Sequence, residues 1–165
     1  MPMKKILVIG CPGSGKSTFA RALQKTVNLP LVHLDMLYWN ADRTTVPRSV
    51  FDERLRVVLA QETWIIDGNY SRTMEQRLQA CDTVFFLDFS AEVCLNGIRA
   101  RHGKPRSDMP WVERSDEIDE EFIAFVRDYN TTSRPKVLEL LEKYRDKRVV
   151  VFRTRAEADA YLMTL

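Results

Sequence analysis

The stretch Gly10-Cys11-Pro12-Gly13-Ser14-Gly15-Lys16-Ser17 decides the fold of this chain. It matches the pattern G-x-x-x-x-G-K-S, a glycine-rich loop whose backbone holds phosphate groups and which is called a P-loop. The apolar run at residues 4–9 predicts a buried strand before the loop. Apolar residues recur at helical spacing over residues 17–27, directly after it. Strand, loop and helix therefore occur in the order that phosphate binding requires.

Each residue type in this loop has a physical role in binding phosphate. Gly13 and Gly15 allow the backbone to turn its N–H groups toward an anion, and the following helix points its positive end at the same place. We expect Lys16 to neutralise the β- and γ-phosphates of ATP, and Ser17 to supply a hydroxyl ligand to Mg²⁺. Cys11 is interpreted as a small filler rather than a reactive thiol. The expected nucleotide-binding residues are Gly10, Cys11, Pro12, Gly13, Ser14, Gly15, Lys16, Ser17 and Thr18.

Length and composition set the class of protein. The chain has 165 residues, 45% of them hydrophobic and 29% charged, which is typical of one soluble globular domain. No run approaches the ~18 apolar residues that span a bilayer, and the first strand begins too early for a signal peptide. Three cysteines at unrelated spacings argue against a disulfide framework or a zinc site, and a cytoplasmic location is expected. The net charge of +2 favours neither nucleic acid nor membrane as a partner, and we expect a monomer or a weak homodimer.

Strand and helix patterns alternate along the chain, which predicts a parallel sheet with helices on both faces. Strands are expected at residues 4–9, 31–34, 63–66, 83–87 and 148–152. Helices are expected at residues 17–27, 48–61, 73–80, 91–102, 116–131, 134–144 and 156–162. We therefore predict one α/β domain over residues 1–165. It is a three-layer α/β/α P-loop NTPase fold with a five-stranded parallel sheet and a short lid at about residues 99–115.

Three carboxylates follow predicted strands, at the edge where ligands collect in such sheets. Asp35 follows the second strand and faces the space of a phosphate acceptor. If the acceptor is a hydroxyl, Asp35 could take its proton, and if it is a phosphate, Asp35 would bind another part of the substrate. Asp67 follows the third strand and is expected, with Ser17, to organise the metal. Asp88 follows the fourth strand and is interpreted as a cap of the next helix.

A basic cluster lies at the end of one predicted helix and in the loop that follows. Arginines on a mobile lid would neutralise the charge that spreads over the γ-phosphate oxygens during transfer, and closure would exclude water. The lid residues assigned to catalysis, together with Lys16 and Asp35, are Arg99, Arg101 and Arg106. His33 and His102 show no metal-ligand pattern, and Arg127 and Arg134 are weaker candidates for closing the lid.

The motifs together resemble those of the nucleoside monophosphate kinase group, which includes adenylate kinase. Asp67-Gly68 is similar to that family's strand-end Asp-Gly, although Gly68-Asn69-Tyr70-Ser71-Arg72 replaces its Gly-Phe-Pro-Arg and places Arg72 one position late. A closer resemblance is to short bacterial topology modulation proteins. It is carried by the P-loop, residues 34–39, residues 64–70 and residues 82–88.

These observations predict a phosphotransferase that uses ATP and Mg²⁺ and passes the γ-phosphoryl group to a small acceptor. The first expectation for the acceptor is a nucleoside monophosphate. The alternative is a hydroxyl-bearing metabolite, as in shikimate- or gluconate-type kinases. A different class is a nucleotide-binding regulatory protein, associated with DNA topology and having little kinase activity. The sequence leaves open the acceptor, the choice between ATP and GTP, and the oligomeric state.

Overall fold

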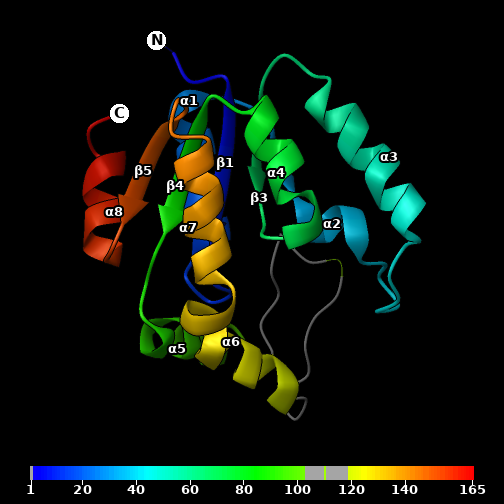
Figure 1. Cartoon of the computed structure of the whole chain (residues 1–165), viewed down its shortest axis with the longest axis vertical. Coiled ribbons are helices and arrows are strands. Elements are labelled where there is room, and N and C mark those ends of the chain that lie inside the picture. The colour runs from blue at the N-terminus through cyan, green and yellow to red at the C-terminus, as the bar shows by residue number, and fades with distance from the viewer. Residues whose placement is uncertain (1, 103–109, 111–118) are drawn as a thin grey trace.

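The computed structural model describes residues 2–102, 110 and 119–165. Its five strands form one sheet in the order β2-β3-β1-β4-β5, and every neighbouring pair is parallel (Figure 1). The predicted five-stranded parallel sheet is therefore confirmed. The strands are β1 Lys5–Gly10, β2 Leu31–His33, β3 Trp64–Asp67, β4 Thr83–Leu87 and β5 Arg148–Phe152.

Helices cover both faces of the sheet and make a three-layer structure. The described helices are α1 Lys16–Val27, α2 Leu34–Tyr38, α3 Arg48–Leu59, α4 Ser71–Ala80, α5 Ala91–Arg101, α6 Glu120–Thr132, α7 Arg134–Lys143 and α8 Arg155–Leu162. One core cluster packs α1, α5, α6 and α8 against one face, and a second packs α3, α4 and α7 against the other. Figure 1 shows α4 and α7 in front of the sheet and α1 behind it. None of the helices in the described part of the chain is long and apolar enough to cross a membrane.

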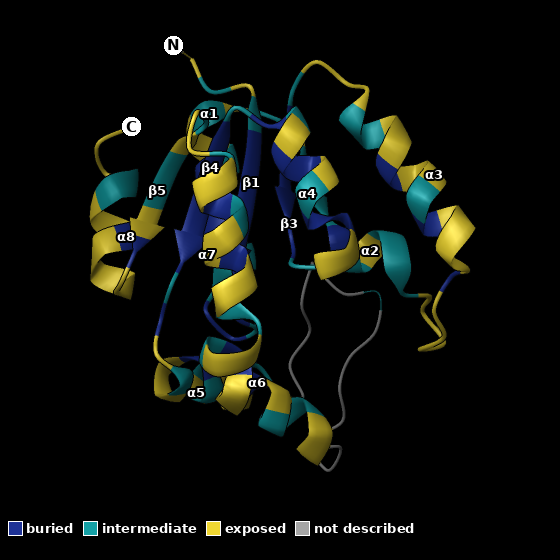
Figure 2. Ribbon diagram, in the orientation of Figure 1, coloured by how far each residue is buried: buried dark blue, intermediate teal, exposed yellow. Residues whose placement is uncertain are grey.

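The strand sequences explain why both faces are covered. In β1, Ile6 and Val8 join the core cluster on one face, whereas Leu7 and Ile9 join the cluster on the other. All four side chains have 0% exposure, and the central strands are continuously buried (Figure 2). A strand buried on both faces is an unbroken apolar run rather than an alternating one, and such runs are typical of parallel sheets between helices.

Strand register brings the predicted site residues to one edge. Val8 is aligned with Asp67, His33 with Asp67, and Gly10 with Leu87, so the carboxyl ends of four strands lie together. The P-loop follows one of these ends, and Asp67 and Asp88 lie at two others. Parallel sheets bind ligands at this edge.

The chain departs from the predicted elements around the second strand. The strand expected at residues 31–34 ends at His33, and the short helix α2 begins at once with Leu34. Asp35 therefore lies in the first turn of α2. Residues 103–109 and 111–118, which include most of the predicted lid and Arg106, lie outside the described residues.

Candidate active site

The P-loop joins β1 to α1 and is held by its own backbone. Gly13 and Gly15 have φ angles of 88° and 89°, a left-handed conformation that suits glycine because a Cβ atom would clash there. Gly15 is the N-cap of α1, and its carbonyl accepts a hydrogen bond from the Phe19 N–H at 2.9 Å. No side chain caps this end of the helix. The loop therefore leaves the positive end of α1 directed at the space it encloses.

Helix α5 lies directly against the P-loop, backbone to backbone. A Cβ atom on Gly13 would lie 2.0 Å from the carbonyl oxygen of Cys94, and one on Gly97 would lie 2.0 Å from the carbonyl oxygen of Gly13. Both positions therefore need glycine for the close approach. The position of α5 therefore fixes the position of the P-loop. Arg101 lies in the last turn of α5, so its position relative to the P-loop is fixed as well.

The exit of β3 is fastened to the start of the P-loop. The side chain of Asn69 accepts a hydrogen bond from the Gly10 N–H at 3.2 Å and donates one to the Gly10 carbonyl at 2.6 Å. Arg77 is fully buried and donates to the carbonyls of Gly68, Asn69 and Tyr70. Burial lowers the pKa of Arg77, and these three carbonyls replace the water that its guanidinium has lost. The loop after β3 is therefore fixed relative to the P-loop.

Lys16, Asp67 and Asp35 share one site. Burial lowers the pKa of Lys16, the negative charges of Asp67 and Asp35 oppose this, and the positive charge of Arg101 adds to it. Asp67 is only 4% exposed, and its carboxylate contacts Nδ1 of His33 on the neighbouring strand. Three predicted site residues and one lid arginine therefore lie close enough to affect one another's charge.

Asp35 is held by an aromatic cluster. The hydroxyl of Tyr70 donates a hydrogen bond to Oδ1 of Asp35. The ring of Tyr70 stacks on Phe51, with centroids 5.3 Å apart, and meets Tyr38 edge-on at 5.3 Å. Tyr38 in turn meets Trp39 at 5.6 Å. The carboxylate thus lies beside a wall of aromatic rings from α2, α3 and the loop after β3.

The predicted lid arginines differ in their placement. Arg101 is half-buried and lies near Lys16, whereas Arg99 is exposed on α5. Arg106 lies outside the described residues. Arg134, at the start of α7, forms two hydrogen bonds of 2.8 and 2.9 Å with Asp88.

The interpretation of Asp88 as a helix cap is wrong. Ser90 caps α5, because its hydroxyl accepts a hydrogen bond from the Val93 N–H at 3.2 Å. The side chain of Asp88 is 5% exposed and instead pairs with Arg134 through both of its oxygens, while Nε of Arg153 lies 3.8 Å from Oδ2. This ion pair fastens the junction of α6 and α7 to the end of β4.

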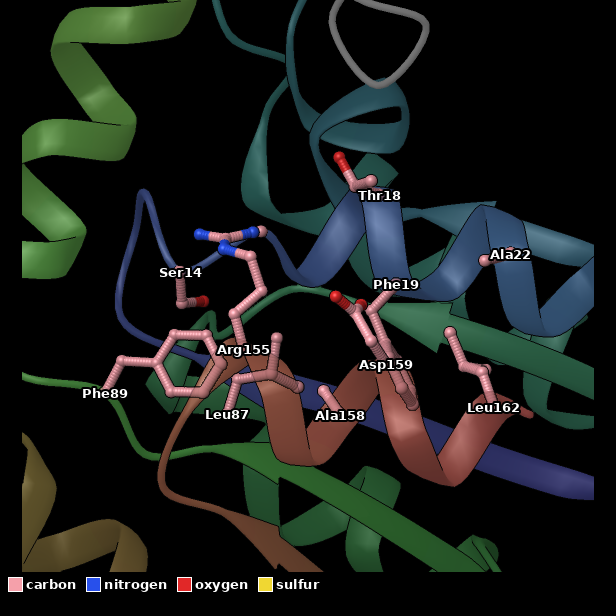
Figure 3. A pocket seen from close by; sticks show the side chains of 11 residues that line it. Ser14, Thr18, Phe19, Ala22, Leu87, Phe89, Arg155, Ala158, Asp159 and Leu162 are labelled. Carbon is pink, nitrogen blue, oxygen red and sulfur yellow. The ribbon is translucent and has the colours of Figure 1, made fainter. Parts of the chain in front are cut away.

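A small cavity of about 60 Å³ lies beside the loop, between α1 and α8 (Figure 3). Its walls include Thr18, Phe89, Arg155 and Asp159. The guanidinium of Arg155 lies over the Phe89 ring, 5.8 Å from its centroid, and a Cβ atom on Gly15 would lie 2.5 Å from its Nη1. Arg155 thus adds a positive charge to the α1 side of the loop, where the sequence assigned it no role.

Cys11 fills space in the loop, as its interpretation as a filler requires. Its side chain is 2% exposed, and Sγ lies 3.8 Å from the Val126 carbonyl. A hydrogen bond with the Cys94 thiol and burial raise the pKa of Cys11, which keeps it protonated. A protonated, buried thiol is a poor nucleophile.

The metal ligands expected from the sequence, Ser17 and Asp67, lie at the start of α1 and at the end of β3. No group of three or more His, Cys, Asp or Glu side chains able to hold a metal occurs in the described part of the chain. Mg²⁺ commonly takes one or two protein ligands and completes its shell with phosphate oxygens and water. Ser17 and Asp67 stay the predicted protein ligands of such a shell.

Several site residues could not be recognised from the sequence. Asn69, Arg77 and Phe51 act through contacts with residues distant in the sequence, and no spacing in the sequence reports these contacts. The close packing at Gly97 could have been inferred from the sequence, because a glycine inside a helix lowers stability and usually has a packing reason.

Neither a protein-family model nor a curated protein sequence matches the chain. Solved structures do. Shikimate kinase from Acinetobacter baumannii in complex with shikimate is 17% identical, with a TM-score of 0.63 over 98% of this chain and 92% of that one. Shikimate kinase from Bacteroides thetaiotaomicron is 19% identical, with a TM-score of 0.56 over 98% of this chain and 95% of that one.

These likenesses show the fold. The chain has the three-layer P-loop α/β fold of the shikimate kinases, as the sequence predicted. The closer resemblance to topology modulation proteins and to adenylate kinase stays a prediction. Function does not follow from fold, so it is argued from the site.

Proposed function

We propose that the protein is a kinase that uses ATP and Mg²⁺ to phosphorylate a hydroxyl group of a small metabolite. The observation that carries this proposal is the convergence of Lys16, Asp67 and Asp35, from the P-loop, β3 and α2, on one site. A phosphate-binding lysine, a metal-organising carboxylate and a carboxylate facing the acceptor are the groups that phosphoryl transfer needs.

The loop would bind the triphosphate of ATP. The N–H groups around Gly13 and Gly15 and the positive end of α1 would surround the β-phosphate, and Lys16 would neutralise the β- and γ-phosphates. The Ser14 hydroxyl is fully buried and has no hydrogen-bond partner among the described residues, so a ligand oxygen could satisfy it. Ser17 and a water held by Asp67 would bind Mg²⁺, which supplies positive charge to the β- and γ-phosphates.

Transfer would then need positioning, neutralisation of charge and a proton acceptor. The acceptor hydroxyl oxygen forms a bond to the γ-phosphorus, the bond from that phosphorus to the bridging β–γ oxygen breaks, and ADP leaves. Asp35 accepts the hydroxyl proton. Arg101, near Lys16, would neutralise charge on the transferred group, and Arg99 and Arg106 would contribute from the lid. Residues 1–165 would form one kinase domain, with the lid at about residues 99–115.

The surroundings of Asp35 favour a hydroxyl acceptor over a phosphate. A phosphate acceptor requires cations near its binding position. Arg72, which the family resemblance would assign to such a phosphate, is exposed and pairs instead with Asp52, at 2.6 and 3.2 Å. Asp35 itself would repel a phosphate. The solved shikimate kinase complex holds a small-molecule substrate in the same fold, which supports this choice.

A panel of acceptors, with formation of ADP as the readout, tests the proposal. Hydroxyl-bearing metabolites should stimulate ADP formation, and mass spectrometry should find the phosphorylated product. The variant Asp35→Asn should lower kcat about 10²- to 10⁴-fold because it lacks the proton acceptor, while the affinity for ATP stays unchanged. Asp128→Asn, an exposed carboxylate on α6, is the matched control. Transfer that survives in Asp35→Asn would contradict the proposal.

Two other functions make different predictions in the same assays. With a nucleoside monophosphate as acceptor, Asp35→Asn should raise KM and leave kcat nearly unchanged. A regulatory protein associated with DNA topology should hydrolyse ATP at a rate that no small acceptor changes, and its binding to duplex DNA should weaken steeply with salt. The pairing of Arg72 with Asp52 counts against a phosphate acceptor, and the net charge of +2 counts against a DNA-binding protein.

A further inference from the structure

We propose that Tyr70 is the positioning residue of Asp35: through its phenol it holds the carboxylate that accepts the proton of the acceptor hydroxyl. This inference rests on the proposed function. The contacts of the Tyr70 side chain are with Asp35, Tyr38, Phe51 and Trp39, which place it on the acceptor side of the site.

The direction of the hydrogen bonds follows from the chemistry of the three groups. Tyr70 bonds to Oδ1 of Asp35 and is also hydrogen-bonded by the side chain of Trp39. An indole N–H only donates, and an ionised carboxylate only accepts. The phenol oxygen therefore accepts from Trp39, and the phenol proton is directed at Asp35.

The environment keeps this phenol protonated. Burial raises the pKa of Tyr70, the charge of Asp35 and the hydrogen bond to Asp35 raise it further, and the Trp39 hydrogen bond opposes them slightly. A phenol with a raised pKa remains a donor throughout the pH range in which a kinase works.

The backbone and the ring packing place the phenol where it is needed. Tyr70 has a φ angle of 39°, an uncommon left-handed conformation for a residue with a side chain, and it immediately precedes α4. Its carbonyl accepts from buried Arg77, at 3.2 Å, and from the Thr73 N–H at 2.9 Å. The stack on Phe51 holds the ring. Because backbone and ring are both fixed, the phenol can hold Asp35 rather than follow it.

The kinetic test is a double-mutant cycle. Tyr70→Phe keeps the ring and removes the hydroxyl, and it should lower kcat with a hydroxyl acceptor about 10- to 100-fold, which is the range for a hydrogen bond to a charged group. The KM for ATP should not change. In the Asp35→Asn background, Tyr70→Phe should have no further effect, because it acts through Asp35. An equal loss in both backgrounds would overturn the inference.

Tyr144→Phe is the matched control, because Tyr144 also donates to a carboxylate, Oε1 of Glu75, at 2.8 Å. It removes the same kind of hydrogen bond between α7 and α4, so it should reproduce any general loss of stability and leave kcat unchanged. If Tyr70→Phe lowers kcat no more than Tyr144→Phe does, Tyr70 has only a structural role and the inference fails.

A measurement without catalysis separates this inference from the proposed function. In proton NMR of the ligand-free protein, the Tyr70 hydroxyl proton should give a downfield resonance that vanishes in Tyr70→Phe, shifts in Asp35→Asn and Trp39→Phe, and stays in place in Tyr144→Phe. A resonance unmoved by Asp35→Asn would overturn the inference even if the protein is a kinase. An intact resonance pattern in a protein that phosphorylates no hydroxyl compound would refute the function and leave the contact in place.

Discussion

The contact between Gly97 and Gly13 makes a prediction whose sign is opposite to that expected from helix propensity. Gly97 lies inside α5, where alanine is normally favoured over glycine by about 1 kcal/mol. If nothing opposed the side chain, Gly97→Ala would therefore raise the melting temperature by about 2–4 °C in a chain of this size. The structure predicts a fall instead.

The magnitude follows from the distance. A Cβ atom at position 97 would lie 2.0 Å from the Gly13 carbonyl oxygen and 2.9 Å from its carbonyl carbon. These are backbone atoms, which cannot rotate away, so α5 or the loop must move by about 1 Å to reach a tolerable contact. Overpacking of this kind costs about 1–3 kcal/mol. At its upper end, less the gain in helix propensity, the net loss is about 2 kcal/mol and the melting temperature falls by about 4–8 °C.

The same displacement should weaken function more than stability. A shift of about 1 Å at a phosphate-binding loop can lower the rate of transfer about 10²-fold. Differential scanning calorimetry measures the loss of stability, and the rate of ADP formation together with titration with Mg·ATP measures the loss of function. Asn96→Ala, an exposed position on the same helix, is the control and should leave ATP affinity unchanged. A Gly97→Ala protein that melts higher and binds ATP normally would refute the packing of α5 on the loop.

Three further predictions concern buried charges and thiols. Arg77→Lys should lower the free energy of unfolding by about 1–3 kcal/mol in urea denaturation, because lysine cannot bond all of the carbonyls that Arg77 joins. An unchanged denaturation midpoint would contradict the role of Arg77 in holding the loop after β3. Arg134→Met should lower the free energy of unfolding by about 1–3 kcal/mol, because it removes the main partner of the buried carboxylate of Asp88. Adding Asp88→Asn should restore part of this loss, and a double variant no more stable than Arg134→Met would show that the unpaired charge does not cause it. Burial raises the pKa of Cys81 from 9.0 to about 11, so the folded state keeps a proton that the unfolded state loses between these pH values. The free energy of unfolding should therefore fall by roughly 2 kcal/mol as the pH rises from 9 to 11. Chemical denaturation at several pH values should find this fall in the wild type and a smaller one in Cys81→Ala.

The sheet and the loop could be predicted because their signals are local. An apolar run of four to six residues specifies a buried strand, and the spacing of Gly13, Gly15 and Lys16 specifies the loop. The rule that ligands collect at the carboxyl edge then brought Asp35 and Asp67 to the correct edge of the sheet without any knowledge of strand order.

The acceptor side could not be predicted because it depends on contacts between distant residues. The bond of Tyr70 to Asp35 spans 35 positions, and that of Asn69 to Gly10 spans 59. Neither pair has a spacing that sequence periodicity can report. Asp88 shows the same limit, since a cap and an ion-pair partner are the same residue type and only the position of Arg134, 46 residues away, distinguishes them.

The most direct test of the account is isothermal titration calorimetry of Mg·ATP with the wild type and with Lys16→Ala. The wild type should bind one nucleotide with measurable heat. Lys16→Ala should weaken binding about 10- to 100-fold, because it removes a charge-assisted contact to the phosphates. If the wild type gives no heat, or if Lys16→Ala binds as well as the wild type, the loop does not hold the phosphates of ATP and the proposed kinase function fails.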